Sequence, residues 1–533
     1  MRLLRNLGVV SGMTLLSRVA GFVREILTAA FLGAGPVADT FFQAITIPNT
    51  FRRVLAEGAF NAAFVPLYAR ELEGANPHEA DHFATEALST LVTATAVIVV
   101  AFQVGAPWLA YVFFPGMADD PGGLAFAAML MQITMPYLLT MAVLALVTGA
   151  LNSHGRFAAS AFAPVLFNLV LIAILAFDFA EGERLAVWLS IGVTVSGVLQ
   201  AAMLYVAARR RGLKISFRLP RLTPRVRRLV ALGVPGALAA GATQINVLVT
   251  SSIATLEEGA RSWINYSERL YQLPLGVIGI AMGVALLPNL ARRVRAGDHE
   301  GGHFTMNRAI ELSMALTLPA AAAFLIIPEF LVRGLYERMN CTAADTQMTA
   351  LALAVFAAGL PAFVLIKVLQ PGFFAREDTR TPMMFSLVSV VVNFILALTL
   401  FFGPLGFVGL AAATSVAGWT NCLLLAVTLR KRGLLEVDKR LARSLPRIVL
   451  ASALMGLSVW VMVAFQDVWL APLAGLIGAG WAMVAGLLAV SAGGGVIYAG
   501  ACLVTGAIRP REIGEAMRSR AVPAPKIEDD PGA

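Results

Sequence analysis

Long apolar stretches separated by short polar connections recur along the whole chain. A helix that crosses a membrane needs about 20 mostly apolar residues, and windows of that length fit about fourteen times. The pattern therefore predicts an all-α integral membrane protein with about fourteen transmembrane helices. The predicted spans are 7–31, 40–68, 84–114, 124–151, 158–179, 185–208, 229–256, 262–291, 306–332, 347–375, 382–402, 406–429, 446–466 and 472–507.

The first span begins like a secretory signal peptide, with Met1–Arg5 ahead of an apolar run to Leu16. Arg18, Arg24 and Glu25 interrupt the next stretch of the chain, and the apolar pattern then resumes. We therefore expect a first membrane helix that is retained.

Composition supports a membrane protein with a single membrane domain. Hydrophobic residues make up 58% of the 533 positions and charged residues 14%, whereas soluble domains are about half apolar and about a quarter charged. No polar stretch is long enough to form a separate globular domain. Cys341, Cys422 and Cys502 lack CxxC spacing, so they predict neither a disulfide framework nor a zinc site.

The placement of charge argues for a membrane topology and against nucleic-acid binding. The net charge of +9 alone could suggest nucleic acid, but the basic residues lie between the apolar runs. The connection 209–228 holds nine Lys/Arg and no Asp/Glu, and the segment 430–447 and the start of the segment from Arg509 are also basic. Acidic residues gather in the alternate connections, which is the positive-inside pattern. It predicts a multi-pass protein of the inner (cytoplasmic) membrane with both termini cytoplasmic.

An internal repeat is visible at a nearly constant offset. Residues 65–70 resemble residues 287–292, and the pair Arg156 and Asn168 recurs as Arg380 and Asn393. The offsets of about 222–225 residues separate positions six spans apart, which predicts two six-helix lobes in a pseudo-twofold repeat around a central cavity. The predicted parts are an N-terminal lobe (1–208), a basic cytoplasmic linker (209–228), a C-terminal lobe (229–431), two additional helices (432–508) and a cytoplasmic tail (509–533).

Charged residues inside the predicted spans are the candidates for function. Each costs roughly 2.5–3.5 kcal/mol on insertion scales, and such residues are usually functional. They are Arg18, Arg24, Glu25, Asp39, Arg52, Arg53, Glu57, Glu268, Arg269 and Lys367.

Helical spacing separates these residues into two groups. Arg53 and Glu57 are an i, i+4 pair that can neutralise itself, and Pro48 and Gly58 can break the helix around it. Four arginines have no obvious local acid, and both halves of the chain contribute to them: Arg18, Arg24, Arg52 and Arg269.

The four arginines predict a shared cationic, water-filled cavity. The arginine fork matches phosphate oxygens, so a di-anionic group such as a pyrophosphate is the expected ligand. The alternative is that the arginines reach the membrane interface or form interhelical salt bridges. That alternative is favoured for Arg53, and for Lys367 both interpretations remain open.

Several of these stretches resemble the MurJ (MviN) family of bacterial lipid II flippases, and the resemblance covers nearly the whole chain. The stretches are SRVAGFVRE (17–25), ADTFF (38–42), IPNTFRR (47–53), AEGAF (56–60), FVP (64–66), ERLYQLPLGV (268–277) and FFARED (373–378).

The resemblance implies the multidrug/oligosaccharidyl-lipid/polysaccharide exporter fold and assigns roles to residues. It implies substrate-binding roles for Arg18, Arg24, Arg52 and Arg269, and it implies that 432–508 forms a groove for a polyprenyl tail. Other cavity or gating positions are Glu25, Asp39, Arg53, Glu57, Glu268, Gln272 and Lys367. Gln272 departs from family members that carry an acid, so a proton role at that position is in doubt.

The resulting hypothesis is a transporter, not an enzyme, with lipid II and membrane lipids as partners and no cofactor. It would move lipid II from the inner to the outer leaflet by alternating access, for cell wall synthesis. Rivals are a flippase for another polyprenyl-pyrophosphate glycan of the O-antigen type, a cationic-drug exporter of the same fold, and a membrane enzyme acting on such a lipid. An arginine-lined cavity repels cationic drugs, and the histidines lack metal-ligand spacing. They are His78, His82, His154, His299 and His303.

Overall fold

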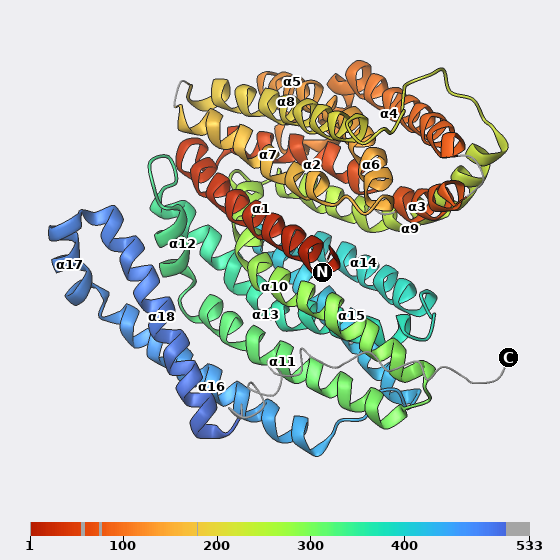
Figure 1. The fold of residues 1–533 in the computed structure, drawn as a ribbon. Helices are drawn as coiled ribbons and strands as arrows, with labels where there is room; N and C mark the ends of the chain where they lie inside the picture. The colour runs from red at the N-terminus through yellow and green to blue at the C-terminus, as the bar shows by residue number, and fades with distance from the viewer. Residues whose placement is uncertain (1, 55–58, 74–76, 178–179, 508–533) are drawn as a thin grey trace, which may run out of the picture. The chain divides into compact units, whose positions relative to one another are not determined.

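The computed structural model describes residues 2–54, 59–73, 77–177 and 180–507, and within these ranges every regular element is a helix. Ten of the described helical segments are long and apolar enough to cross a membrane. The predicted all-α, multi-pass membrane architecture is therefore confirmed. The chain forms two compact units, one of residues 1–273, 328–362 and 378–425, the other of the remaining segments. Figure 1 shows the helices of each unit.

The first unit contains most of the helices. Eleven lie wholly within it, and α10, α13 and α15 contribute part of their length. The bounds are α1 (Arg2–Leu32), α2 (Pro36–Arg52), α3 (Ala59–Leu72), α4 (Pro77–Phe113), α5 (Pro121–Thr134), α6 (Tyr137–Ser153), α7 (Ala158–Ala176), α8 (Gly182–Arg209), α9 (Pro224–Ala254), α10 (Ala260–Arg295), α12 (Pro328–Tyr336), α13 (Ala343–Phe374), α14 (Arg380–Phe401) and α15 (Phe407–Lys431).

Four predicted spans are helical but do not belong to the ten apolar segments. They correspond to α1, to α2 with α3, to α9 and to α10. Except for α9, these spans carry the predicted intramembrane charges other than Lys367, which lies on α13. In the second span α2 ends at Arg52 and α3 begins at Ala59, and the predicted break near Gly58 falls on residues outside the described ranges.

Two other predicted spans were wrong in their continuity. The span 306–332 ends early, because α11 stops at Ile326 and Pro328, which has no N–H, opens α12. The span 124–151 is confirmed as one apolar segment, Pro121–Ser153, in which a turn at Met135 and Pro136 separates α5 from α6. The span 472–507 is divided at Gly478, whose φ of 83° ends α17 (Gln466–Ile477) before α18 (Ala479–Thr505). Hydropathy cannot detect these breaks because the residues on both sides are equally apolar.

An aromatic stack forms part of the core of the first unit. Phe60, Phe64 and Tyr68 recur every four residues along one face of α3, with ring centroids 5.3 and 5.2 Å apart. Phe83 of α4 stacks on Phe64 at 5.7 Å. Buried residues of α6 and α8 complete the cluster, so α3 is anchored although it belongs to a broken span.

The basic linker between α8 and α9 is ordered along α4. Its Leu213 and Ile215 side chains are buried in the same core. The intervening backbone N–H groups donate to polar side chains spaced one helical turn apart on α4. These contacts are Lys214 to Asp81 (3.2 Å), Ser216 to Thr85 (3.2 Å) and Arg218 to Ser89 (3.0 Å).

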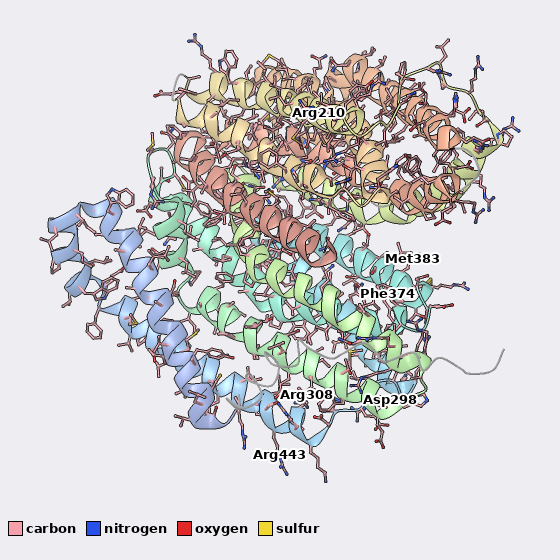
Figure 2. All side chains as sticks on the ribbon, viewed as in Figure 1. Arg210, Asp298, Arg308, Phe374, Met383 and Arg443 are labelled. Atoms are coloured by element: carbon pink, nitrogen blue, oxygen red, sulfur yellow. The ribbon has the colours of Figure 1, made fainter. Side chains whose placement is uncertain are left out.

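In the second unit, α16 (Lys439–Ala464) packs against both α11 (His299–Ile326) and α18. The Tyr498 hydroxyl of α18 donates to the Ala315 carbonyl of α11 at 2.6 Å. Arg308, which is labelled in Figure 2, forms ion pairs with Glu311 and with Asp438. Asp438 also caps α16 by accepting from the Leu441 N–H at 2.6 Å.

Two adjacent glycines of α18 provide a matched test of this packing. A Cβ at Gly494 would lie 2.8 Å from Val459 of α16, whereas a Cβ at Gly495 would meet nothing within 4 Å. We expect Gly494→Val to lower the free energy of unfolding by about 1–3 kcal/mol relative to Gly495→Val, because overpacking forces the helices apart. Reversible unfolding in an SDS titration measures the difference. Equal stabilities of the two variants would contradict the observed α16–α18 contact.

Candidate functional site

A polar cavity of about 740 Å³ lies within the first unit. Side chains of α1, α2, α6, α7, α9, α10 and α14 line it. The described lining residues include five arginines and two glutamates, so the cavity is cationic. Three of the four arginines predicted to share it line it, namely Arg24, Arg52 and Arg269. The charged lining residues are Arg24, Glu25, Arg52, Arg53, Arg261, Glu268 and Arg269.

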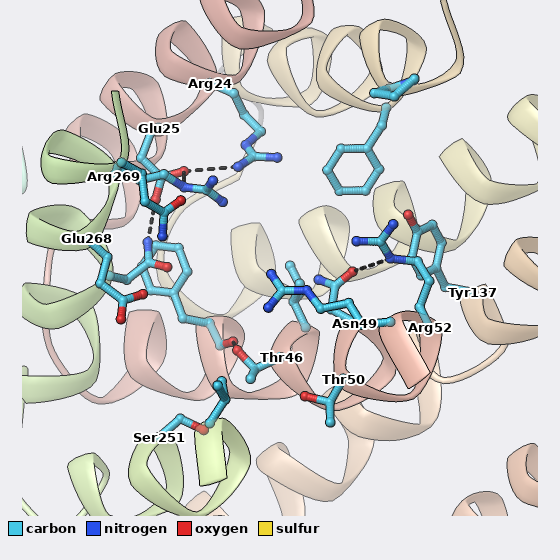
Figure 3. A pocket seen from close by; sticks show the side chains of 18 of the residues that line it. Arg24, Glu25, Thr46, Asn49, Thr50, Arg52, Tyr137, Ser251, Glu268 and Arg269 are labelled. Carbon is cyan, nitrogen blue, oxygen red and sulfur yellow. Dashed lines mark hydrogen bonds and ion pairs between the residues drawn. The ribbon is translucent and has the colours of Figure 1, made fainter. Parts of the chain in front are cut away.

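One carboxylate joins two of the predicted arginines. Arg24 Nη2 lies 3.0 Å and Arg269 Nε 3.4 Å from the same oxygen of Glu25, which is buried (Figure 3). Asn265, one turn before Arg269 on α10, donates to the other oxygen. The prediction that Arg24 has no local acid was therefore wrong, because the adjacent Glu25 pairs with it. Arg269 has no local ion pair among the described residues, as predicted, and its acid comes from the distant helix α1.

Asn168 of α7 holds the same part of α1. Its amide oxygen accepts from Arg24 Nη1 at 3.1 Å, and its amide nitrogen donates to the Ser17 carbonyl at 3.1 Å. A Cβ at Gly21 would lie 3.5 Å from this amide, so the glycine permits the close approach. Asn168 thereby fixes both the helix and its arginine.

The second half of the repeat makes a corresponding contact. Asn393 of α14, the repeat partner of Asn168, accepts from Asn246 of α9 at 3.0 Å. Asn246 follows Arg24 at the offset of the repeat. The repeat-related helix pairs α1–α7 and α9–α14 are therefore joined in the same way, but a neutral amide on α9 takes the place of the arginine on α1.

A second hollow of about 630 Å³ adjoins the cavity within the first unit. Arg18 lines this hollow and not the main cavity, whereas Arg24, Arg269 and Gln272 line both. Apolar side chains of α1 near Arg18, such as Val19, are exposed. Arg24 and Arg269 thus mark the junction of the two spaces.

Asp39 is buried and does not line the cavity; it binds the N-terminus of α10. Its carboxylate accepts from the Gly259 N–H at 2.7 Å, the Ser262 N–H at 2.8 Å and the Ser262 hydroxyl at 2.6 Å. The positive end of the α10 dipole adds to this attraction. Residue Asp39 therefore ties the first half of the chain to the second.

Two further hydrogen bonds join the end of α1 and the following turn to the second half of the chain. The Tyr266 hydroxyl of α10 donates to the Gly33 carbonyl at 2.5 Å. The Asn340 side chain, between α12 and α13, donates to the Phe31 carbonyl at 2.6 Å. The region where α1 ends and α2 begins is thus bound both by α10 and by the connection between α12 and α13.

The other predicted residues are placed as follows. Arg52 Nε donates to the Asn49 amide oxygen at 3.2 Å (Figure 3), and Arg53 and Glu268 line the cavity. Glu57 lies outside the described residues. Lys367 belongs to the second unit, where its side chain is exposed, and its predicted cavity role stays a prediction.

Sequence reasoning missed Arg261. It is 7% exposed, lines the cavity, and donates from Nη2 to the Thr46 hydroxyl at 2.8 Å. It immediately precedes the predicted span 262–291 and was therefore treated as part of a connection. Arg261 follows Asp39 by 222 residues, which is the offset of the internal repeat. Because Asp39 had already been identified as an intramembrane charge, this spacing was the available signal.

Comparisons with known proteins agree with this architecture. The family described as lipid II flippase MurJ matches residues 28–476. The probable lipid II flippase MurJ of Rhizobium meliloti (strain 1021) is 47% identical over 87% of this chain and 87% of that protein. The lipid II flippase MurJ of Burkholderia cenocepacia is 34% identical over 87% of this chain and 91% of that protein. These relatives are named as flippases and not as enzymes.

Solved structures share the fold. A lipid II flippase MurJ in an inward closed conformation has a TM-score of 0.72 at 22% identity, covering 95% of this chain and 99% of that one. An inward-facing multidrug resistance MATE family transporter of the MOP superfamily has a TM-score of 0.65 at 13% identity, covering 80% and 97%. The second likeness extends the fold to the wider exporter superfamily.

Removal of the Asp39 carboxylate tests its hydrogen bonds to the N-terminus of α10. We expect Asp39→Ala to lower the free energy of unfolding by about 2–4 kcal/mol, because each buried donor left unpaired costs about 1–3 kcal/mol. The exposed cap Asp298, which accepts from the Gly301 N–H at 2.8 Å, is the control. Asp298→Ala should cost about 1 kcal/mol, since water can replace an exposed cap. Equal losses in SDS unfolding would contradict a special role for Asp39.

Proposed function

Because the chain belongs to the MurJ family of lipid II flippases, we propose that it moves lipid II from the inner to the outer leaflet of the cytoplasmic membrane for cell wall synthesis. Lipid II is an undecaprenyl-pyrophosphate-linked disaccharide-peptide. The observation that carries the proposal is the cationic cavity with Arg24 and Arg269 at its junction with a second hollow. A transporter of this kind needs no catalytic residue.

The pyrophosphate would bind at this junction. Arg24 and Arg269 share one acid, Glu25, so the three groups together keep a net positive charge. Arginine binds phosphate oxygens through two parallel hydrogen bonds, and such bonds are strong in a low-dielectric cavity. Arg18 in the adjoining hollow and Arg52 in the cavity would complete the site.

Alternating access would move the head group past the contacts that join α1 and α2 to the second half. With both termini cytoplasmic and about fourteen spans in two six-helix lobes, these contacts would lie toward the periplasm. The hydrogen bonds of Asp39, Gly33 and Phe31 to the second half would have to break for the head group to leave on that side. Substrate can drive this change only by binding the two states with different affinity.

The C-terminal helices would guide the polyprenyl tail, which stays in lipid. An apolar hollow of about 260 Å³ in the second unit supports this role. Its lining residues come from α16, α17 and α18 and carry no charge: Val461, Met462, Phe465, Trp469 and Ala489.

Depletion of the protein in living cells tests the proposed function directly. A periplasmic enzyme that cleaves only lipid II exposed on the outer leaflet reports translocation. We expect cleavage to fall and total lipid II to rise on depletion, because lipid II would accumulate on the inner leaflet. Unchanged exposure would reject lipid II as the principal substrate and favour another polyprenyl-linked glycan. Accumulation of a chemically altered lipid in its place would favour an enzyme.

Alanine substitutions test the site. Arg18→Ala, Arg24→Ala, Arg52→Ala and Arg269→Ala should each fail to support growth of depleted cells, because each removes a donor to the pyrophosphate. Immunoblots of membrane fractions must show normal amounts of each variant. Arg184→Ala, at an exposed residue near the start of α8, is the control and should support growth. Normal growth with all four cavity variants would contradict the assignment.

A further inference from the structure

Arg261 is a charged cavity residue whose binding capacity is incompletely used. Its side chain comes from the first turn of α10 and is only 7% exposed. One of its nitrogens donates to Thr46, a neutral hydroxyl. Among the residues that the structure describes, none accepts a hydrogen bond from Arg261 Nε. A buried guanidinium without full pairing is costly.

No acidic side chain in the described parts of the chain neutralises Arg261 directly. Glu268 and Asp39 carry the opposite charges that act on it most strongly. Neither forms an ion pair with it within these parts: Asp39 is engaged by Gly259 and Ser262, and the ion pairs of the cavity centre on Glu25. Arg261 therefore has no ion-pair partner among the described residues and contributes a positive charge to the cavity that it lines.

The position of Arg261 separates it from the junction of the two hollows. Arg269 lines both hollows, whereas Arg261 lines only the main cavity. Arg269 lies eight residues after Arg261 on α10. At about 1.5 Å per residue, this spacing places the two residues about 12 Å apart along the helix axis. If Arg24 and Arg269 bind the pyrophosphate at the junction, the rest of the head group fills the main cavity. Arg261 would then contact that part of the head group.

We propose that Arg261 binds a carboxylate of the head-group peptide, as an anion site separate from the pyrophosphate arginines. This inference rests on the proposed function. In the head group beyond the pyrophosphate, the sugars offer mostly neutral hydroxyl groups, whereas a peptide ends in a carboxylate. A carboxylate accepts two parallel hydrogen bonds from a guanidinium fork. Because Nε is enclosed, the two Nη groups of Arg261 would form this pair.

Binding to the purified full-length protein in lipid nanodiscs tests the site with three ligands. They are lipid II with free peptide carboxylates, lipid II with those carboxylates amidated, and undecaprenyl pyrophosphate. We expect Arg261→Gln to weaken binding of free-acid lipid II by about tenfold or more, the effect of losing one charged hydrogen-bond pair. Its affinity for undecaprenyl pyrophosphate should not change. Arg269→Gln should weaken binding of both free-acid lipid II and undecaprenyl pyrophosphate. The control Arg184→Gln should weaken binding of neither of these two ligands.

The amidated ligand makes the test independent of how the variants fold. Wild-type protein should bind amidated lipid II about tenfold or more weakly than the free acid, and Arg261→Gln should bind both forms equally. Equal binding of both forms by the wild type overturns the inference. A parallel loss of lipid II and undecaprenyl pyrophosphate in Arg261→Gln overturns it too, because Arg261 would then belong to the pyrophosphate site. Wild-type protein that binds no lipid II at all rejects the proposed function itself.

Discussion

The charge on Glu25 is the constraint on which the cavity depends. Arg24 and Arg269 come from opposite halves of the chain, and without a shared acid they would repel each other in a medium of low dielectric constant. Glu25 is buried, so loss of its arginine partners would leave a carboxylate charge unpaired away from water. Glu25 thus allows two cations to lie side by side and still leaves the group attractive to an anion.

Polar side chains with more than one partner also explain how the helices around the cavity are held. The amide of Asn168 binds both Arg24 and the α1 backbone, and the carboxylate of Asp39 binds the start of α10. Both are side chains that a membrane helix tolerates only when their hydrogen bonds are satisfied. Asn168 therefore positions a helix together with its arginine, and Asp39 positions the helix that carries Arg261 and Arg269.

Sequence patterns predicted the helices and most of the charged cavity residues, because apolar length and the cost of buried charge are local properties. They did not predict that Glu25 pairs with Arg269, since that contact joins residues distant in sequence. They did not predict the break at Gly478, because hydropathy is blind to backbone conformation. Arg261 was missed because it lies one residue outside a predicted span, where charge appears ordinary.

The presence of Asn246 where the first repeat has an arginine gives the cavity a direction. An exact duplication would place equal charge on two facing walls, and a ligand could lie either way round. Here α1 offers a cation where α9 offers an amide. An anionic ligand therefore meets a cation at one of these two equivalent contacts and a neutral amide at the other. Its two orientations in the cavity consequently differ in electrostatic energy.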